Sequence, residues 1–195
     1  MSVARDPMAE FGALFERARN SPEPGDATAC ALATASADGT PSVRMVLLKG
    51  FDDRGFVFYT NYGSRKAQDI EENPRAALCF HWISIKQQVR VEGSVERVSE
   101  EESDIYFASR GRLSRLGAWA SKQSQPLASR GDLLRRFAAV ELRYPVGPVP
   151  RPQFWGGYRL RPERIEFWSN KSHRLHDRRV FSRSGEGWTV RRLYP

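Results

Sequence analysis

The stretch SHRLHDRR, residues 172–179, gathers two of the three histidines of the chain and three of its arginines within eight positions. Side chains of these types bind metals, nucleic acids or small anions, or they form a solvated basic strand. If the stretch is extended, alternation along the strand places Arg174, His176 and Arg178 on one face. His173 then lies on the opposite face, so the two histidines point apart and a zinc site is disfavoured. Two guanidiniums that flank an imidazole instead suit an anionic ligand.

A second basic element lies in YTNYGSRKAQDI, residues 59–70. A strand ends there, a glycine turn follows, and Ser64 opens a helix that we expect to extend to about Asn73. The unpaired N–H groups of this helix N-terminus, the Ser64 hydroxyl and the side chains of Arg65 and Lys66 would together surround a phosphate. In the alternative interpretation Ser64 only caps the helix and both cations are solvated. That arrangement places two positive charges at the positive end of the helix dipole, which is unfavourable without an anion.

The positive charge of the chain is concentrated in its last third. There are 31 Lys+Arg and 23 Asp+Glu residues, and residues 1–130 carry 17 of each sign, which leaves 14 basic and 6 acidic residues in 131–195. Such a segment is typical of nucleic-acid binding or of local anion binding. Because the arginines are spread through predicted strands rather than gathered in a tail, local anion binding fits equally well.

The length and hydropathy of the chain predict one domain over residues 1–195 that lies in the cytoplasm. A chain of this length with 40% hydrophobic residues buries one sizeable core. No apolar run approaches the roughly 20 residues that cross a bilayer, and the start MSVARDPMAEF lacks the apolar stretch of a signal peptide. Cys30 and Cys79 lie within apolar runs, so we expect buried free thiols rather than a disulfide or a metal site.

The periodicity predicts an opening helix and then mainly short strands. Asp6 and Pro7 suit the N-cap and first helical position, and the helix with its linker would take up residues 1–28. Ser99 and Glu102 form a capping box for a further helix, and GDLLRRFAAVEL forms another. Turn signals separate β-rich runs that indicate antiparallel strands. We expect an α+β fold that is mainly β, a small antiparallel barrel with peripheral helices.

Six segments of the chain closely resemble the pyridoxamine 5′-phosphate oxidase family. They are SVRMVLLKGFD, FVFYTNYGSRKAQDIEENPRAALCFHW, QQVRVEGSVERVS, YFASRGRLSRLGAWASKQS, FWGGYRLRPERIEFW and HRLHDRRVF. They follow the family's order with similar spacing, from about residue 29 to residue 195. The resemblance implies an FMN-binding split β-barrel and a homodimer whose two flavin sites lie at the interface and are built from both chains. In this interpretation residues 145–195 supply strands for dimerisation and for the active site.

The resemblance also implies the site residues and no metal. The expected FMN contacts are Arg44, Met45, Val46, Leu47, Leu48, Lys49, Tyr59, Thr60, Arg65, Lys66, Gln88, Gln123, Ser124, Trp168 and Arg178. The expected substrate contacts are Lys49, Tyr106, Arg110, Ser114, Arg174, Leu175 and His176. Arg174 and His176 would act at the reacting C4′ carbon, with His176 as a hypothetical proton acceptor.

Two of these assignments depend on local geometry that the sequence leaves open. Arg44 and Lys49 have opposite strand parity, so the strand ends or bulges before Lys49, or one of the two side chains points elsewhere. Tyr106 and Arg110 are neighbours only if both are helical. Without the resemblance, ordinary structural roles would be favoured, with Tyr106 and Trp168 as core residues and Gln123 as a simple loop residue.

The implied reaction is the oxidation of pyridoxamine or pyridoxine 5′-phosphate to pyridoxal 5′-phosphate, with dioxygen as acceptor and hydrogen peroxide as product. The sequence departs from the usual family pattern at Gln87, Gly111 and Arg115, where arginine, proline and glutamine are usual. Gly111 loosens a segment that is expected to bind the substrate phosphate. Three alternatives stay open: a flavin oxidase of the phenazine-biosynthesis type, a non-catalytic FMN or pyridoxal-phosphate binding protein, and a nucleic-acid binder.

Overall fold

The computed structural model describes residues 6–22 and 25–195. Residues 1–5, at the start of the predicted N-terminal segment, and residues 23–24 of the predicted linker lie outside this description. The helices are α1 (Pro7–Arg19), α2 (Arg65–Glu72), α3 (Glu100–Ser109), α4 (Arg112–Ala120) and α5 (Arg130–Arg143), with short 3-10 turns η1 (Ile83–Ile85) and η2 (Ser172–Arg174). In the described ranges, no helix has the length and apolar character needed to cross a membrane.

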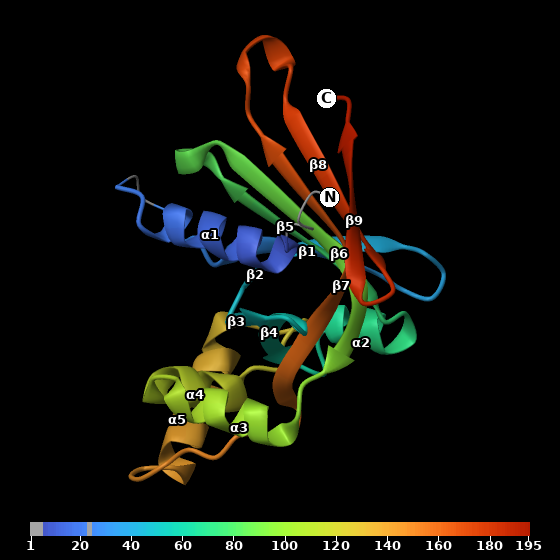
Figure 1. The fold of residues 1–195 in the computed structure, drawn as a ribbon. Coiled ribbons are helices and arrows are strands. Elements are labelled where there is room, and N and C mark those ends of the chain that lie inside the picture. The colour runs from blue at the N-terminus through green and yellow to red at the C-terminus, as the bar shows by residue number, and fades with distance from the viewer. Residues whose placement is uncertain (1–5, 23–24) are drawn as a thin grey trace.

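The strands form one antiparallel sheet, as the sequence predicts. They are β1 (Ala29–Ala35), β2 (Pro41–Leu47), β3 (Gly50–Asp52), β4 (Gly55–Asn61), β5 (Arg75–Trp82), β6 (Gln87–Arg97), β7 (Trp155–Ser169), β8 (Asp177–Ser184) and β9 (Gly187–Leu193). The strand order is β2-β1-β5-β6-β7-β4-β3, and β8 joins β7 to β9. The sheet curls strongly, and the helices lie around its periphery (Figure 1).

Helix α1 covers the inner face of the curled sheet. The Asp6 carboxylate caps it by accepting hydrogen bonds from the backbone N–H groups of Met8 and Ala9, and Pro7 occupies the first turn, as the sequence predicts. Phe11 is fully buried and contacts the rings of Phe51, Phe56, Phe80 and Trp82, with centroids 4.8–5.6 Å apart. Burying each such ring contributes roughly 1.5–3 kcal/mol, so this cluster fixes the helix on the sheet.

The long strand β7 organises the sheet because its two halves have different neighbours. Along one edge it pairs with β6, while along the other it pairs first with β4 and then with β8. The register shifts opposite Gly93, where an added Cβ would lie 1.9 Å from the carbonyl oxygen of Arg161. A glycine is therefore required at this irregularity, which lets β7 leave β4 and continue beside β8.

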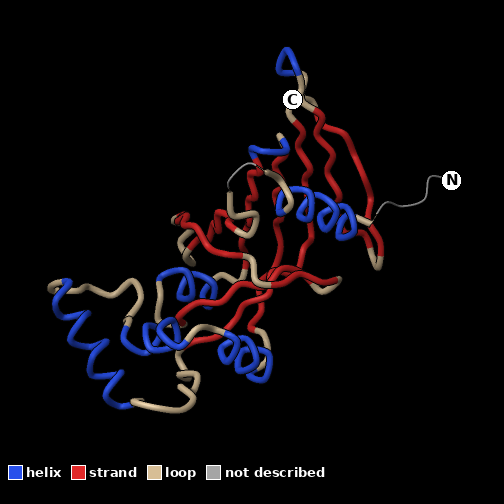
Figure 2. Tube along the Cα trace, turned by 90° about the vertical axis from the view of Figure 1, so that its left-hand side faces the viewer, coloured by secondary structure: helices blue, strands red, loops and turns tan. Residues whose placement is uncertain are grey.

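The two ends of β7 lie in different surroundings. Its N-terminal end lies near α3, α4 and α5, whereas its C-terminal end leads into the turn before β8 at the opposite end of the molecule (Figure 1). The α4–α5 hairpin extends to the side of the sheet (Figure 2). Thirteen residue steps at about 3.3 Å each place Trp155 and Trp168 roughly 40 Å apart along the strand.

Two local predictions are corrected by the structure. The stretch that includes Arg174 and His176 is not extended: η2 occupies 172–174, His173 and Arg174 have φ of 56° and 60°, and β8 begins only at Asp177. The alternating faces expected there do not form. Helix α3 ends at Ser109, and Arg110 follows in extended conformation, so Tyr106 and Arg110 are not two helical positions one turn apart.

Candidate functional site

Lys66 forms the centre of a buried polar cluster at the N-terminus of α2. Its side chain is buried, with the residue 8% exposed, and Nζ donates to Thr60 Oγ1 and Ser64 Oγ at 3.2 Å and to Gln123 Oε1 at 3.0 Å. Ser64 occupies the N-cap position, but its hydroxyl makes no capping bond and faces Lys66 instead. The alternative in which Ser64 caps the helix and Lys66 is solvated is therefore wrong.

The ammonium of Lys66 has only neutral oxygens as partners in the described ranges. Burial, together with the nearby charge of Arg44, lowers its pKa to about 8. A buried cation without a carboxylate partner is unfavourable on its own, so the cluster is suited to receive an anion. Arg65, on the first turn of the same helix, is exposed.

Arg44 extends the positive region from β2. Its Nη1 donates to Thr34 Oγ1 at 2.6 Å, its Nη2 donates to Ser42 Oγ at 2.6 Å, and Asp69 Oδ2 lies 3.7 Å from Nη2. Burial and the charge of Arg65 lower the pKa of Arg44, while Asp69 opposes that shift. Arg44, Arg65 and Lys66 therefore form one electropositive region, and Asp69 holds the first of them.

A loop from the end of α4 lies against this cluster. Asn61 Nδ2 donates to the carbonyl oxygen of Ser121, and Thr60 donates to Gln123 Oε1 at 2.7 Å. Ser124 follows in the same loop with φ of 67° and is exposed. The loop thus brings Gln123 to the polar cluster at Lys66.

Three stacked aromatic rings line the neighbouring part of the site. The rings of Tyr59 and Tyr106 are 3.9 Å apart at 15°, and Tyr59 and Trp155 are 5.4 Å apart at 10°. Burial raises the pKa of Tyr59 to about 12, so the phenol stays neutral at physiological pH. Such a stack offers flat apolar surface beside the cations.

Arg110 approaches this stack from the end of α3. Its guanidinium lies over the Trp155 ring, 4.7 Å from the centroid, and its buried Nη1 has no hydrogen-bond partner in the described part of the chain. Burial lowers its pKa. A buried donor that lacks a partner costs about 1–3 kcal/mol, so Nη1 marks a place for an anionic ligand.

A pocket of about 270 Å³ brings most of these residues together. Its lining is Met45, Val46, Leu47, Lys49, Tyr59, Thr60, Lys66, Tyr106, Arg110, Gln123 and Trp155. Strand β2 ends at Leu47 and Lys49 lies in the connection to β3, which resolves the parity question for Arg44 and Lys49: the strand ends before Lys49. Leu48 points its side chain into the core, and Ser114 is exposed on α4 outside this lining.

The remaining predicted residues lie at the other end of β7. Gln88 on β6 and Arg178 on β8 are both register partners of Trp168, so the three form one row across the sheet. Trp168 is half-buried while its neighbour Phe167 is in the core, so the predicted alternative of a barrel-core tryptophan is wrong. Arg178 Nε donates to the buried Glu166 at 2.8 Å.

The turn before β8 holds the residues expected at the reacting carbon. The His176 ring lies 4.6 Å from the Trp168 ring, and His176 Nδ1 accepts a 3.3 Å hydrogen bond from the backbone N–H of Lys171. Arg174 and Leu175 are exposed on the same turn. These residues lie at the same end of β7 as the row of Gln88, Trp168 and Arg178, and they do not line the pocket at Lys66.

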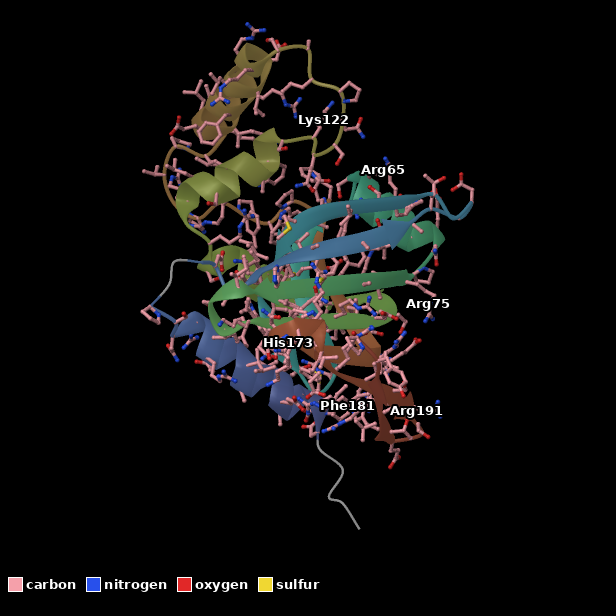
Figure 3. All side chains as sticks on the ribbon, turned by 90° about the horizontal axis from the view of Figure 1, so that it is seen from above. Arg65, Arg75, Lys122, His173, Phe181 and Arg191 are labelled. Atoms are coloured by element: carbon pink, nitrogen blue, oxygen red, sulfur yellow. The ribbon has the colours of Figure 1, made fainter. Side chains whose placement is uncertain are left out.

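The site residues thus form two groups within one chain. Arg65 and the loop at Lys122 lie on the same side of the molecule, whereas His173 lies well away from them (Figure 3). We call the residues around Lys66, Tyr59 and Arg110 the phosphate cluster, and the residues around Trp168, Arg178 and His176 the row group. Within the residues that the structure describes, the two groups of one chain are not in contact.

Sequence reasoning missed three residues of these groups. Trp155 stacks on Tyr59 and beneath Arg110, Asp69 approaches Arg44, and Glu166 pairs with Arg178. A signal for Glu166 was present, because a carboxylate two positions before Trp168 shares its strand face. Nothing in the local sequence marks the partners of Trp155 or Asp69.

The residues of the phosphate cluster fit a flavin mononucleotide. A phosphate would supply the missing counter-charge at Lys66, next to the exposed Arg65 and the free N–H groups at the start of α2. Arg110 brings a second cation to the same pocket, and its unpaired Nη1 fits a second anionic ligand.

Comparisons with known proteins identify the family of the chain. Residues 22–144 match the family model described as "Pyridoxamine 5'-phosphate oxidase", and residues 155–195 match "Pyridoxine 5'-phosphate oxidase C-terminal dimerisation region". A "Pyridoxine/pyridoxamine 5'-phosphate oxidase" of Rubrobacter xylanophilus is 59% identical over 97% of this chain and 87% of its own length. The protein of that name from Gluconobacter oxydans is 56% identical over 100% of this chain and 97% of its own.

Solved structures share the fold. PhzG from Burkholderia lata, in complex with tetrahydrophenazine-1-carboxylic acid, has a TM-score of 0.86 at 34% identity, covering 97% of this chain and 91% of its own. A pyridoxamine 5′-phosphate oxidase-related, FMN binding protein from Nostoc punctiforme has a TM-score of 0.76 at 20% identity, covering 100% and 99%. The expected split-barrel fold is confirmed. On the matched family models and the identity of its relatives, the chain belongs to the pyridoxamine 5′-phosphate oxidase family.

Proposed function

We propose that the chain is an FMN-dependent oxidase that converts pyridoxamine 5′-phosphate or pyridoxine 5′-phosphate to pyridoxal 5′-phosphate. The observation that carries the proposal is that one pocket, lined by stacked aromatic rings, holds two cations: the buried Lys66 ammonium, whose partners are neutral oxygens, and Arg110, whose Nη1 is unpaired in the described part of the chain. Two ligands that each combine a flat ring with a phosphate match that pattern. The names of the relatives from Rubrobacter and Gluconobacter support the same substrates.

The active enzyme is a homodimer in which the phosphate cluster of one subunit lies against the row group of its partner. Three observations support this: the two groups lie at opposite ends of β7, the pocket of about 270 Å³ is smaller than the usual ligand pocket, and a dimerisation region matches residues 155–195. Val43 and Met45 on the outer face of β2 are 69% and 65% exposed, so an apolar surface lies beside the pocket. FMN would bind at this interface. The division into one domain with dimerisation strands over 145–195 stays part of the proposal, and the cytoplasmic location stays a prediction.

FMN, when bound, supplies the electron acceptor for the oxidation of C4′ and passes two electrons to dioxygen, which yields hydrogen peroxide. The chain's own part is to bind and orient. Lys66 and Arg65 would bind the flavin phosphate, with Arg44 adding positive charge beside them, and Arg110 with Tyr106 would hold the substrate phosphate. Fixing both phosphates aligns the two rings, an effect that reaches about 7 kcal/mol or more in favourable intramolecular cases.

His176 and Arg174 of the row group would face C4′. Because Nδ1 accepts a hydrogen bond from Lys171, a neutral His176 ring carries its proton on Nε2 and donates there. In this geometry His176 orients the oxygen or nitrogen on C4′. A role as proton acceptor would require the ring to give up the Lys171 contact.

An aerobic turnover assay tests the proposal. The purified protein with FMN is mixed with pyridoxamine 5′-phosphate or pyridoxine 5′-phosphate, and the aldehyde product and hydrogen peroxide are measured together. We expect both products in equal amounts. Bound FMN without aldehyde would leave a non-catalytic binding protein, and affinity for DNA that weakens steeply with salt, without flavin binding, would favour the nucleic-acid alternative.

A second substrate class deserves the same assay. The likeness to PhzG favours a flavin oxidase of the phenazine-biosynthesis type as the alternative. A tetrahydrophenazine carboxylic acid is the probe. Faster turnover of this compound than of either B6 phosphate would replace the first proposal by the second.

A further inference from the structure

Glu166 is a buried carboxylate in the middle of the row group. It lies on β7, is 3% exposed, and shares a strand face with Trp168 two positions further on. Buried carboxylates are retained only when their charge is compensated, so its partners indicate what it does.

Each oxygen of Glu166 binds a guanidinium from a different neighbouring strand. Oε1 accepts a 2.8 Å hydrogen bond from Arg178 Nε on β8, and Oε2 accepts a 2.7 Å bond from Arg90 Nη2 on β6. Burial raises the pKa of Glu166, but the hydrogen bond from Arg178 and the charges of Arg90 and Arg178 outweigh it and leave the pKa below its ordinary value. The carboxylate is therefore ionised at neutral pH.

The register of the sheet explains why Arg178 needs such a partner. Glu166 is directly opposite Arg90 and Val180, whereas Arg178 is opposite Trp168, two pairs nearer to the C-terminal end of β7. The Arg178 side chain reaches back along the face to Glu166, and its Nη1 donates to the carbonyl oxygen of Tyr194 at 3.1 Å. In the described part of the chain, Nη2 makes no hydrogen bond and the Arg178 side chain is 26% exposed, so this edge of the guanidinium is left for another partner.

We infer that Glu166 is a positioning residue that holds Arg178 in one orientation, so that its free edge meets the flavin carried by the partner subunit. The inference rests on the proposed function. Glu166 itself touches neither flavin nor substrate. An arginine held through Nε presents its remaining N–H groups in a fixed plane, which a freely rotating side chain does not.

The test compares Glu166→Gln with Glu92→Gln. Glu92 lies on the same sheet face and is the matched control, because it is 38% exposed at the side chain and its contacts with Arg90 and Arg164 are longer, at 3.5 and 3.6 Å. FMN is titrated into each protein by quenching of flavin fluorescence, and the circular dichroism of the bound flavin is recorded. We expect Glu166→Gln to weaken FMN binding about tenfold and to alter the flavin signal, with Glu92→Gln unchanged.

A double-mutant cycle with Arg178→Lys separates positioning from a structural role. If Glu166 acts through Arg178, Glu166→Gln adds little further loss of FMN affinity in the Arg178→Lys background. Additive losses would overturn the inference, and so would a Glu166→Gln protein with a lower melting temperature but wild-type FMN affinity and flavin signal.

Two further controls keep the outcome decisive. If Glu166→Gln does not fold, Glu166→Asp keeps the charge between the two arginines but shortens the reach, and it should fold while still weakening FMN binding. Wild-type affinity in that variant overturns the inference. Titration of the unchanged protein comes first. If it binds no FMN, the proposed function fails. If it binds FMN but the affinity does not depend on position 166, only the inference about Glu166 fails.

Discussion

Lys66 and Gln123 lie 57 positions apart in the chain, yet Lys66 Nζ donates a 3.0 Å hydrogen bond to Gln123 Oε1. The bond joins the first turn of α2 to the loop that follows α4. It gives the ammonium a neutral partner that a phosphate can replace or supplement. The two residues therefore preform a site whose charge is uncompensated until an anion arrives.

The affinity for FMN should fall above pH 8. Burial and Arg44 lower the pKa of Lys66 to about 8 in the free protein, and a bound phosphate would raise it. Binding then takes up a proton above pH 8, so the affinity is constant below that pH and falls by up to about tenfold per unit above it. Fluorescence titration of FMN between about pH 7 and about pH 9.5 measures this. Lys122→Met, in the exposed neighbouring loop, should keep the slope, and a slope that persists in Lys66→Met would assign it to another group.

Removing the ammonium should stabilise the free protein. Because the pKa of Lys66 is lowered from 10.5, the unfolded chain binds more protons than the native one between about pH 8 and 10.5, and stability rises with pH across that window. At pH 7 the native state carries the full cost of a buried charge. Lys66→Met should raise the free energy of unfolding by about 1–2 kcal/mol while it weakens FMN binding. Urea unfolding without FMN measures the first effect, and a loss of stability would contradict it.

Two inactive variants should restore activity when they share a dimer. Lys66→Ala impairs the phosphate cluster and Arg178→Ala impairs the row group. In each homodimer, both active sites are therefore incomplete. A mixed dimer has one site with both changes and one that is intact. Random pairing then gives about a quarter of wild-type activity after co-expression. Either variant alone stays inactive, and no recovery in verified mixed dimers would show that each site is built from one chain.

Gly111→Pro should stabilise the protein. Gly111 has φ of −56°, close to the value fixed by proline, and a Cβ there meets nothing within 4 Å. Arg110 before it has φ of −74° and ψ of 147°, the extended conformation that a following proline favours. We expect about 0.4–1 kcal/mol from the lower entropy of the unfolded chain, measured by thermal unfolding. Gly39→Pro is the control that should destabilise, because Gly39 has φ of 84°.

Arg110→Met should reduce the use of phosphorylated substrate without affecting the flavin. The variant keeps apolar contact with Trp155 but loses the unpaired Nη1. We expect kcat/KM to fall about a hundredfold, mainly through KM, while the Kd for FMN is unchanged. Arg130→Met, an exposed arginine at the start of α5, should behave as wild type. A Kd for FMN that rises in parallel with KM would place Arg110 at the flavin instead.

The sequence predicts the parts of this protein whose signals are local. Asp6 with Pro7 indicates the start of α1, and Ser99 with Glu102 indicates the start of α3. The strand periodicity failed at Arg174 and His176 because the chain reverses there with two residues at positive φ, which no glycine or asparagine announces. Helix α3 ends at Ser109, and Arg110 continues in extended conformation to lie over Trp155, a contact between distant positions that no local pattern predicts.

The site could be predicted only through resemblance, because its contacts join distant parts of the chain. Nothing near Ser64 shows that its hydroxyl faces Lys66 rather than the helix N–H groups, and that choice depends on Gln123. Likewise, the strand parity of Arg44 and Lys49 was ambiguous until the end of β2 at Leu47 was known. Which residues share a pocket follows from the sheet register, and register depends on long-range pairing.

Opposite Gly93, β7 parts from β4 and continues beside β8, and this affects how a substitution acts in the assembled enzyme. In the proposed dimer a single continuous ribbon reaches both catalytic centres, with Trp155 contributing to one and Trp168 to the other. A substitution that bends β7, such as one that adds a side chain at position 93, would impair both active sites together. A wild-type partner subunit would not fully restore either of them.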